Sequence, residues 1–200
     1  GKPPLWDGPL YERGNSIDRP GTSHISIIDK GGNILSMTTT IESAFGSHLM
    51  VGGFLLNNEL TDFSFAPFGE NGELVANMAE GGKRPRSSMA PTIVFDLDGN
   101  PVLVIGSAGG SRIIGYVLQR IIAVLDWGMS IDEAMAMPHI LARSETIEFE
   151  QQSAISNAMD ELGNAVKVHD LNSGLTAIHI QGDTNIGAAD PRREGMAQGQ

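Results

Sequence analysis

The strand-like stretches of this chain come in pairs. β-Branched and apolar residues alternate with polar ones over residues 22–29 (TSHISIID) and 34–41 (ILSMTTTI), which predicts two strands. The sequence KGGN at 30–33 joins them as a hairpin. A second hairpin is predicted where strands at 92–96 and 102–105 flank the sequence LDGN. Further short strands are expected at 54–56, 147–150, 166–168, 175–180 and 185–189.

Helical periodicity begins in the second half of the chain. Apolar residues recur at helical spacing and predict one core-facing side of a helix, with Gly128 as its stop: Ile113, Ile114, Val117, Leu118, Ile121, Ile122 and Leu125. Ser130 and Glu133 fit a capping box for a short second helix. A third helix is expected over 153–162. Strands are thus followed by helices and then by strands again, an order typical of an α+β protein with a mostly antiparallel sheet covered by helices.

Two stretches show neither period. Residues 1–20 are polar and rich in Pro and Gly, so we expect an extended arm and not a signal peptide. Residues 65–83 are predicted to be a long surface loop, and loops of that length often act as lids.

Composition narrows the classes of function. A formal charge of −11 over 200 residues disfavours a nucleic-acid partner, because phosphate binding needs a cationic surface. The absence of cysteine excludes disulfides and cysteine–zinc sites. The five histidines show no metal-ligand spacing, and no apolar run is as long as a membrane span. We expect no metal and no cofactor.

Thr22 is the first candidate for chemistry. A hydroxyl is a weak nucleophile without an adjacent base, but an N-terminal threonine carries its own base in the α-amine. Thr22 would become N-terminal if its hydroxyl attacked the carbonyl of Gly21 and the resulting ester were hydrolysed. Taken alone, a glycine and a threonine before a strand are better explained as a turn followed by a β-branched strand residue. His24, two residues further on, should share the strand face of Thr22 and is interpreted as structural.

Three other segments offer polar groups. The glycines of 106–111 (GSAGGS) precede a helix, so their N–H groups could form an oxyanion hole or bind a phosphate, or the segment could be a tight turn. Ser87 and Ser88 could bind a carboxylate, although they could also belong to a solvated basic loop. Glu59 and Asp62 could bind an ammonium group, or could end a strand with Asx-turn chemistry.

In combination and order, these segments resemble the small subunit of the gamma-glutamyltransferase family. The resemblance extends from Thr22 to about residue 193 and rests on these motifs in chain order: GTSH at 21–24, DKGGN at 29–33, TTTI at 38–41, FGS at 45–47, LLNNELTDFS at 55–64, KRP at 83–85, SSMAPT at 87–92, GSAGGSRI at 106–113 and ADPR at 189–192.

The resemblance implies an N-terminal-nucleophile hydrolase with an αββα sandwich. It also implies cleavage between Gly21 and Thr22, after which Thr22 carries a gamma-glutamyl ester. Residues 1–21 would be the end of the large-subunit segment, and residues 22–200 the small-subunit catalytic domain. The partners implied are that large subunit and a small gamma-glutamyl substrate, with a periplasmic or extracellular location.

The family's site residues map onto this chain one by one. Thr40 would hydrogen-bond the nucleophile, Gly109 and Gly110 would supply oxyanion N–H groups, and residues 65–82 would form the lid. The substrate α-ammonium and α-carboxylate would be bound by two acids and two serines: Glu59, Asp62, Ser87 and Ser88.

This sequence departs from the family pattern at Glu42, where asparagine is usual. An added carboxylate at this substrate-binding position could change specificity, so an acylase acting on glutaryl or cephalosporin-type amides is one alternative. A catalytically silent binding module is another, because almost none of the large subunit is present. Where that subunit would pack, we expect exposed edges and apolar surface, and hence self-association.

Overall fold

The two predicted hairpins are present in the computed structural model, which describes residues 21–143 and 146–199. The described residues form two compact units. The smaller unit comprises residues 41–87, and the larger unit comprises residues 21–40 and 88–199. The arm predicted at 1–20 lies outside the described residues.

The larger unit contains a hairpin, a four-stranded sheet and a three-stranded sheet. The hairpin and the four-stranded sheet are antiparallel throughout, and the order of the four strands is β11-β10-β6-β5. The hairpin consists of β1 (Thr22–Ile28) and β2 (Ile34–Thr40). The four-stranded sheet consists of β5 (Thr92–Phe95), β6 (Pro101–Gly106), β10 (Thr176–Gln181) and β11 (Thr184–Ala189).

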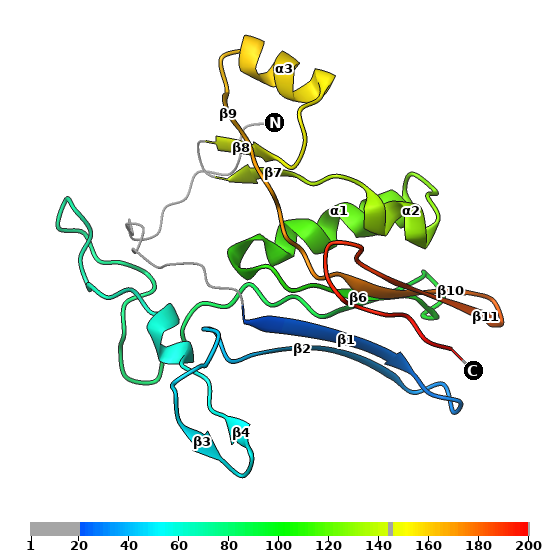
Figure 1. The fold of residues 1–200 in the computed structure, drawn as a ribbon, viewed down its shortest axis with the longest axis horizontal. Coiled ribbons are helices and arrows are strands. Elements are labelled where there is room, and N and C mark those ends of the chain that lie inside the picture. The colour runs from blue at the N-terminus through cyan, green and yellow to red at the C-terminus, as the bar shows by residue number, and fades with distance from the viewer. Residues whose placement is uncertain (1–20, 144–145, 200) are drawn as a thin grey trace. The chain divides into compact units, whose positions relative to one another are not determined.

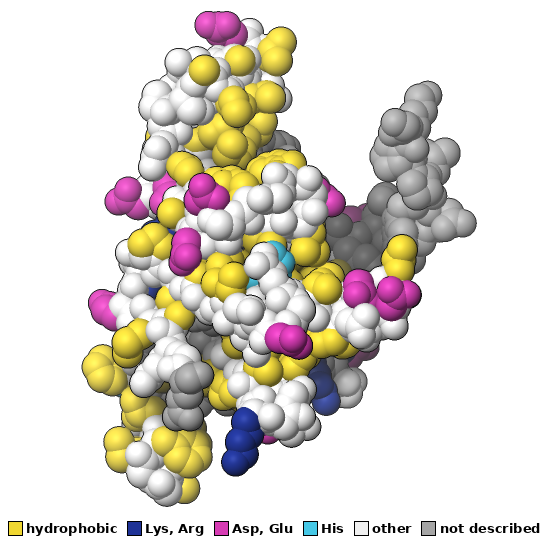
Figure 2. All heavy atoms as spheres, turned by 90° about the vertical axis from the view of Figure 1, so that its right-hand side faces the viewer, with side chains coloured by type: hydrophobic (Ala, Val, Ile, Leu, Met, Phe, Trp, Pro, Cys, Tyr) yellow, Lys and Arg dark blue, Asp and Glu magenta, His cyan; other side chains and the backbone are white. Residues whose placement is uncertain are grey.

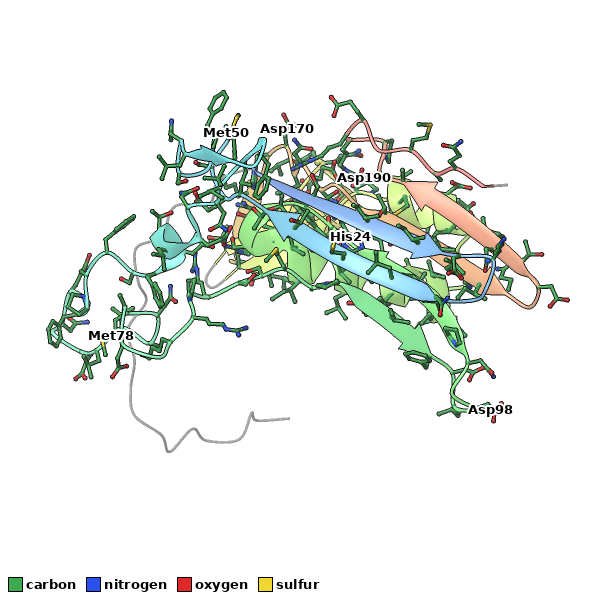
Figure 3. All side chains as sticks on the ribbon, turned by 90° about the horizontal axis from the view of Figure 1, so that it is seen from below. His24, Met50, Met78, Asp98, Asp170 and Asp190 are labelled. Carbon is green, nitrogen blue, oxygen red and sulfur yellow. The ribbon has the colours of Figure 1, made fainter. Side chains whose placement is uncertain are left out.

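Two hairpin turns have the same internal chemistry. The Asp29 carboxylate accepts from the backbone N–H of Asn33 at 2.9 Å and from its side-chain amide at 2.8 Å. Asp96 accepts from the backbone N–H of Asn100 at 2.8 Å in the same way, and Asp98 marks the tip of that hairpin in Figure 3. The Asp side chain thus closes each turn and fixes the strand register.

The four-stranded sheet is covered on both faces. Leu103 and Ile105 of β6 point into the buried core formed with helix α1 (Ile113–Leu125) and helix α2 (Ile131–Ala136). Because side chains alternate along a strand, Val104 and Gly106 face the other way, where the β1–β2 hairpin packs. Figure 1 shows the resulting layers, with the hairpin on one side of the sheet and the helices on the other.

The buried face of helix α1 matches the predicted one only in part, since Ile113 and Val117 are buried as expected. Ile114 and Leu118 were expected among its core-facing positions, but both are about half exposed. The core face instead includes Tyr116 and the fully buried Arg120. The helix is apolar over more than half of its circumference, so periodicity alone selected too wide a face.

The rest of the larger unit is a small sheet with one helix. Its strand order is β7-β8-β9, and β8 and β9 are parallel, the one such pair among the named strands in the described ranges. The capping box predicted at Ser130 and Glu133 is confirmed at the start of α2. The elements of the small sheet are β7 (Ile140–Arg143), β8 (Thr146–Phe149), β9 (Ala165–Val168) and helix α3 (Ala154–Glu161).

The smaller unit has little regular structure. It contains the two-stranded ribbon β3 (Met50–Val51) and β4 (Phe54–Leu55), followed by a 3-10 turn at Glu59–Asp62. Residues 65–83 form the predicted loop, which contains an isolated bridge between Phe68 and Leu74, and a second bridge joins Met78 of the loop to Ser64 just before it. Within the described ranges, no helix is long and apolar enough to cross a membrane.

Candidate functional site

Thr22 and Thr40 face each other across the first hairpin. They are paired in the β1–β2 register, and both side chains are half-buried. The Thr22 hydroxyl donates to the Thr40 hydroxyl at 3.2 Å, and the Thr40 hydroxyl donates to the carbonyl oxygen of Gly21 at 3.3 Å. The strand pairing therefore creates a chain of hydrogen bonds that begins at the candidate nucleophile and ends on the peptide bond preceding it.

His24 supports this strand face from inside. Its ring is buried against Gly106 of β6, and Nδ1 lies 2.7 Å from the Thr38 hydroxyl. Desolvation lowers the pKa of His24 to about 4, so the ring is neutral at pH 7. Its position on the hairpin is marked in Figure 3. As a neutral side chain packed between two layers, it has the structural role expected from the sequence.

Gly109 and Gly110 lie between β6 and α1. Their φ angles are 134° and 62°, which favour glycine, and Gly110 opens the 3-10 turn that leads into the helix. A Cβ on Gly109 would lie 2.5 Å from the Tyr116 ring. The turn thus depends on both glycines, and it can present backbone N–H groups at the positive end of the helix. In Figure 1, the beginning of α1 and the Thr22 end of β1 lie toward the same end of the sheet.

Three carboxylates gather in the smaller unit. Glu42 is buried with a φ of 66°, and its Oε2 accepts from the Asn58 side-chain amide at 2.5 Å. Burial first, then the charge of Asp62 and a hydrogen bond with its side chain, and last the charge of Glu42 raise the pKa of Glu59 to about 6. One oxygen of Glu59 is buried and makes no hydrogen bond with the described residues. A cation placed here would relieve both the repulsion and the missing hydrogen bond.

Two asparagines organise this acidic cluster, and neither was predicted from the sequence as a site residue. Asn58 bridges Glu42 and the Thr61 hydroxyl, which it reaches at 2.9 Å. Asn77 donates to the Asp62 carbonyl at 2.6 Å and accepts from the Arg86 N–H at 2.9 Å. Asn58 stands inside the LLNNELTDFS motif and could have been found there, whereas Asn77 lies in a loop without any local signal.

The serine pair stands where the two units join in sequence. Ser87 is exposed and ends the smaller unit, while Ser88 is half-buried and begins the larger one. Within the smaller unit, the contact of Asn77 with Arg86 holds the segment leading to Ser87 close to Asp62.

Known proteins of one family are similar to this chain in sequence and in structure. A model of the Gamma-glutamyltranspeptidase family matches residues 6–200. The glutathione hydrolase proenzyme of Bacillus subtilis (strain 168) is 35% identical over 99% of this chain and 36% of its own length. That of Escherichia coli (strain K12) is 36% identical over 86% of this chain and 31% of its own length.

A solved structure shares the fold. A mutant gamma-glutamyltranspeptidase chain from Pseudomonas nitroreducens superimposes with a TM-score of 0.77 at 33% identity, over 88% of this chain and 98% of that one. The α+β fold expected from the sequence, that of N-terminal-nucleophile hydrolases, is thereby confirmed. The chain spans about a third of the length of the curated relatives it matches. With the match covering nearly every residue, this chain belongs to the gamma-glutamyltranspeptidase family.

Proposed function

We propose that this chain is the nucleophile-bearing part of an enzyme that transfers gamma-glutamyl groups to water or to an amino acid, with Thr22 as nucleophile. The observation that carries the proposal is the hydrogen-bond chain from Thr22 through Thr40 to the Gly21 carbonyl. The proenzyme names of the relatives support a precursor that is cleaved before it acts.

Cleavage would begin from this hydrogen-bond chain. Thr40 polarises the Gly21 carbonyl through its hydroxyl proton, and its oxygen accepts the hydrogen bond from Thr22. The Thr22 oxygen attacks the carbonyl carbon, the C–N bond breaks, and the nitrogen takes up the proton that the hydroxyl loses. Water then hydrolyses the ester, which leaves a Gly21 carboxylate and a free α-amine on Thr22.

The free amine would serve as the base for catalysis. It takes the hydroxyl proton as the Thr22 oxygen attacks the γ-carbonyl of the substrate, and it returns that proton to the leaving amine. N–H groups of Gly109 and Gly110 would stabilise the oxyanion, an effect worth about 10²–10³-fold in kcat for each donor. Water or an amino acid then attacks the ester and releases Thr22.

The acidic cluster favours a gamma-glutamyl substrate over a glutaryl one. We propose that Glu42, Glu59 and Asp62 bind the α-ammonium, and that Ser87 and Ser88 bind the α-carboxylate. A glutaryl group has no ammonium, so it would leave unrelieved the repulsion among the carboxylates, which adds to burial in raising the pKa of Glu59. The loop at 65–82 is proposed as the lid.

Membership of the family supports a division of the chain into two segments. We propose that residues 1–21 end a large-subunit segment and that residues 22–200 form the small-subunit domain, with the large subunit as partner. The outward face of the β1–β2 hairpin offers an apolar surface for such a partner to cover, because four large apolar residues are exposed on it: Ile25, Ile27, Leu35 and Met37. Figure 2 shows hydrophobic side chains at the surface of another face too, among scattered acidic ones. Without the partner, such surfaces favour self-association.

The test compares two anilides. Wild-type and Thr22→Ala proteins are incubated with gamma-glutamyl and glutaryl p-nitroanilide, each with and without a large subunit of the family added. The proposal is supported if the wild type turns over the gamma-glutamyl compound, with or without the large subunit, and Thr22→Ala does not. Preference for the glutaryl compound would indicate an acylase, and glutamate binding without turnover in every mixture would indicate a silent module.

A further inference from the structure

The larger unit contains a buried serine flanked by a histidine and an aspartate. Ser173, His139 and Asp190 are at most 2% exposed. The Ser173 hydroxyl lies 2.7 Å from His139 Nε2 and donates to Asp190 Oδ2. Their burial rules out direct contact with a substrate, so the arrangement acts within the fold.

The proton positions in this cluster follow from its donors and acceptors. An ionised aspartate only accepts, so the single hydroxyl proton of Ser173 points to Asp190. His139 Nε2 must then donate to the Ser173 oxygen, which fixes the ring as the Nε2–H tautomer. Its other nitrogen, Nδ1, is buried and has no hydrogen-bond partner among the described residues. Ser173 is thus held rigidly from two sides.

The segment that carries Ser173 lies against the glycine turn. Its neighbour Gly174 exchanges two backbone hydrogen bonds with Ala108, at 3.2 and 3.3 Å, and Ala108 immediately precedes Gly109. The Gly174 N–H also reaches the Ser107 hydroxyl at 3.3 Å. A displacement of Ser173 is therefore passed to the residues before the turn.

The same cluster reaches the turn by a second route. The His139 ring packs on Tyr116 with ring centroids 4.0 Å apart. The Tyr116 ring in turn fills the space beside Gly109, where a Cβ would lie 2.5 Å from it. Asp190 is anchored from behind by Arg192, whose guanidinium binds it at 3.1 Å. The turn is thus braced through its backbone on one side and through an aromatic ring on the other.

We propose that Ser173, held between His139 and Asp190, is a positioning residue that fixes the Gly109–Gly110 turn for catalysis. The inference rests on the proposed function of that turn as the oxyanion site. In Ser173→Ala, the His139 N–H loses its acceptor and Asp190 Oδ2 loses one of its two donors, the other being the Leu175 N–H, so the His139 ring must rearrange. The turn keeps both of its N–H donors but loses their fixed direction, so the loss of kcat should be smaller than for deletion of a donor.

The experiment measures the turn and the reaction separately. Ser173→Ala is expected to shift the backbone amide resonances of Gly109 and Gly110, and to lower kcat by about 10-fold with KM changed by less than about twofold. The control is Ser156→Ala, which removes another fully buried hydroxyl, one that caps α3 and donates to the Ser153 carbonyl at 2.8 Å. It should leave the glycine resonances and kcat unchanged.

Unshifted glycine resonances in a folded Ser173→Ala protein, or an unchanged kcat, would overturn the proposal. A wild type without turnover would refute the proposed function alone, because the resonances still decide the positioning role. Should Ser173→Ala not fold, His139→Phe takes its place, since it keeps a ring on Tyr116 and removes the donor to Ser173. A His139→Phe protein whose glycine resonances match the wild type would equally contradict the inference.

Discussion

Acidification should destabilise this protein through His139, and one substitution should remove the effect. Burial, followed by the positive charges of Arg120 and Arg192, lowers the pKa of His139 from 6.5 to about 2. Asp190, reached through Ser173, and Glu150, which accepts from the His139 backbone N–H at 2.8 Å, are the acids in its surroundings. The folded protein therefore keeps His139 neutral at any pH above about 2.

Proton linkage gives the direction and the size of the change in unfolding free energy with pH. Between pH 6.5 and pH 2 the unfolded chain binds a proton at His139 and the folded protein does not. The free energy of unfolding therefore decreases by about 1.4 kcal/mol for each unit by which the pH is lowered. From pH 7.5 to pH 4.5, about 2 of those units lie below the unfolded pKa, which gives a loss of about 2.7 kcal/mol from this histidine. His139→Phe cannot titrate and escapes that loss.

Urea unfolding of the wild type and His139→Phe at pH 7.5 and pH 4.5 measures the difference. The unfolding free energy of the variant relative to the wild type should rise by about 2.7 kcal/mol on acidification. Ile105→Val is the control, because it weakens the same core by about 1 kcal/mol without a titratable group, so its separation from the wild type should stay constant. Parallel curves for wild type and His139→Phe would refute the assignment of a neutral buried histidine.

Three further outcomes are expected. Gly106→Ala should lower the unfolding free energy by about 1–3 kcal/mol in urea titrations, because its Cβ would lie 2.1 Å from the His24 ring; equal stability would mean that the ring is not packed there. Thr40→Val should slow cleavage before Thr22 by about 10- to 100-fold on gels, since it removes the hydroxyl that contacts both nucleophile and carbonyl, and wild-type kinetics would count against that contact. KM for a gamma-glutamyl substrate should rise about 10-fold from pH 7 to pH 5, because Glu59, with its pKa of about 6, takes up a proton over this range. Glu59→Gln should abolish this dependence of KM on pH, and an unchanged dependence in that variant would exclude Glu59 as the titrating group.

Local patterns in the sequence were enough to predict most elements of the larger unit. Alternation located both hairpins, and the Asp–Asn turns that close them are local chemistry. Strand β7 was missed, because Ile140–Arg143 has no clean alternation and becomes a strand only by pairing with β8. Strand β3 was missed for a similar reason, since two residues are too few to show a period.

The site residues, too, could be predicted from the sequence only where local strand pairing brings them together. Thr22 and Thr40 could be placed opposite each other once the hairpin register was known. The clustering of Glu42 with Glu59 could not be derived from spacing, because it depends on Asn58 and on a backbone at positive φ. The buried contacts of Ser173 join residues that are 17 and 34 positions apart, and no local pattern announces them.

The most direct test is a mass measurement of the intact protein and its fragments, before and after brief exposure to a gamma-glutamyl donor followed by acid quench. The account predicts a fragment that begins at Thr22 in the wild type, a single gamma-glutamyl group on that residue after exposure, and an uncleaved, unmodified Thr22→Ala protein. Cleavage at the same bond in Thr22→Ala, or a gamma-glutamyl group found on a different residue of the wild type, would contradict it.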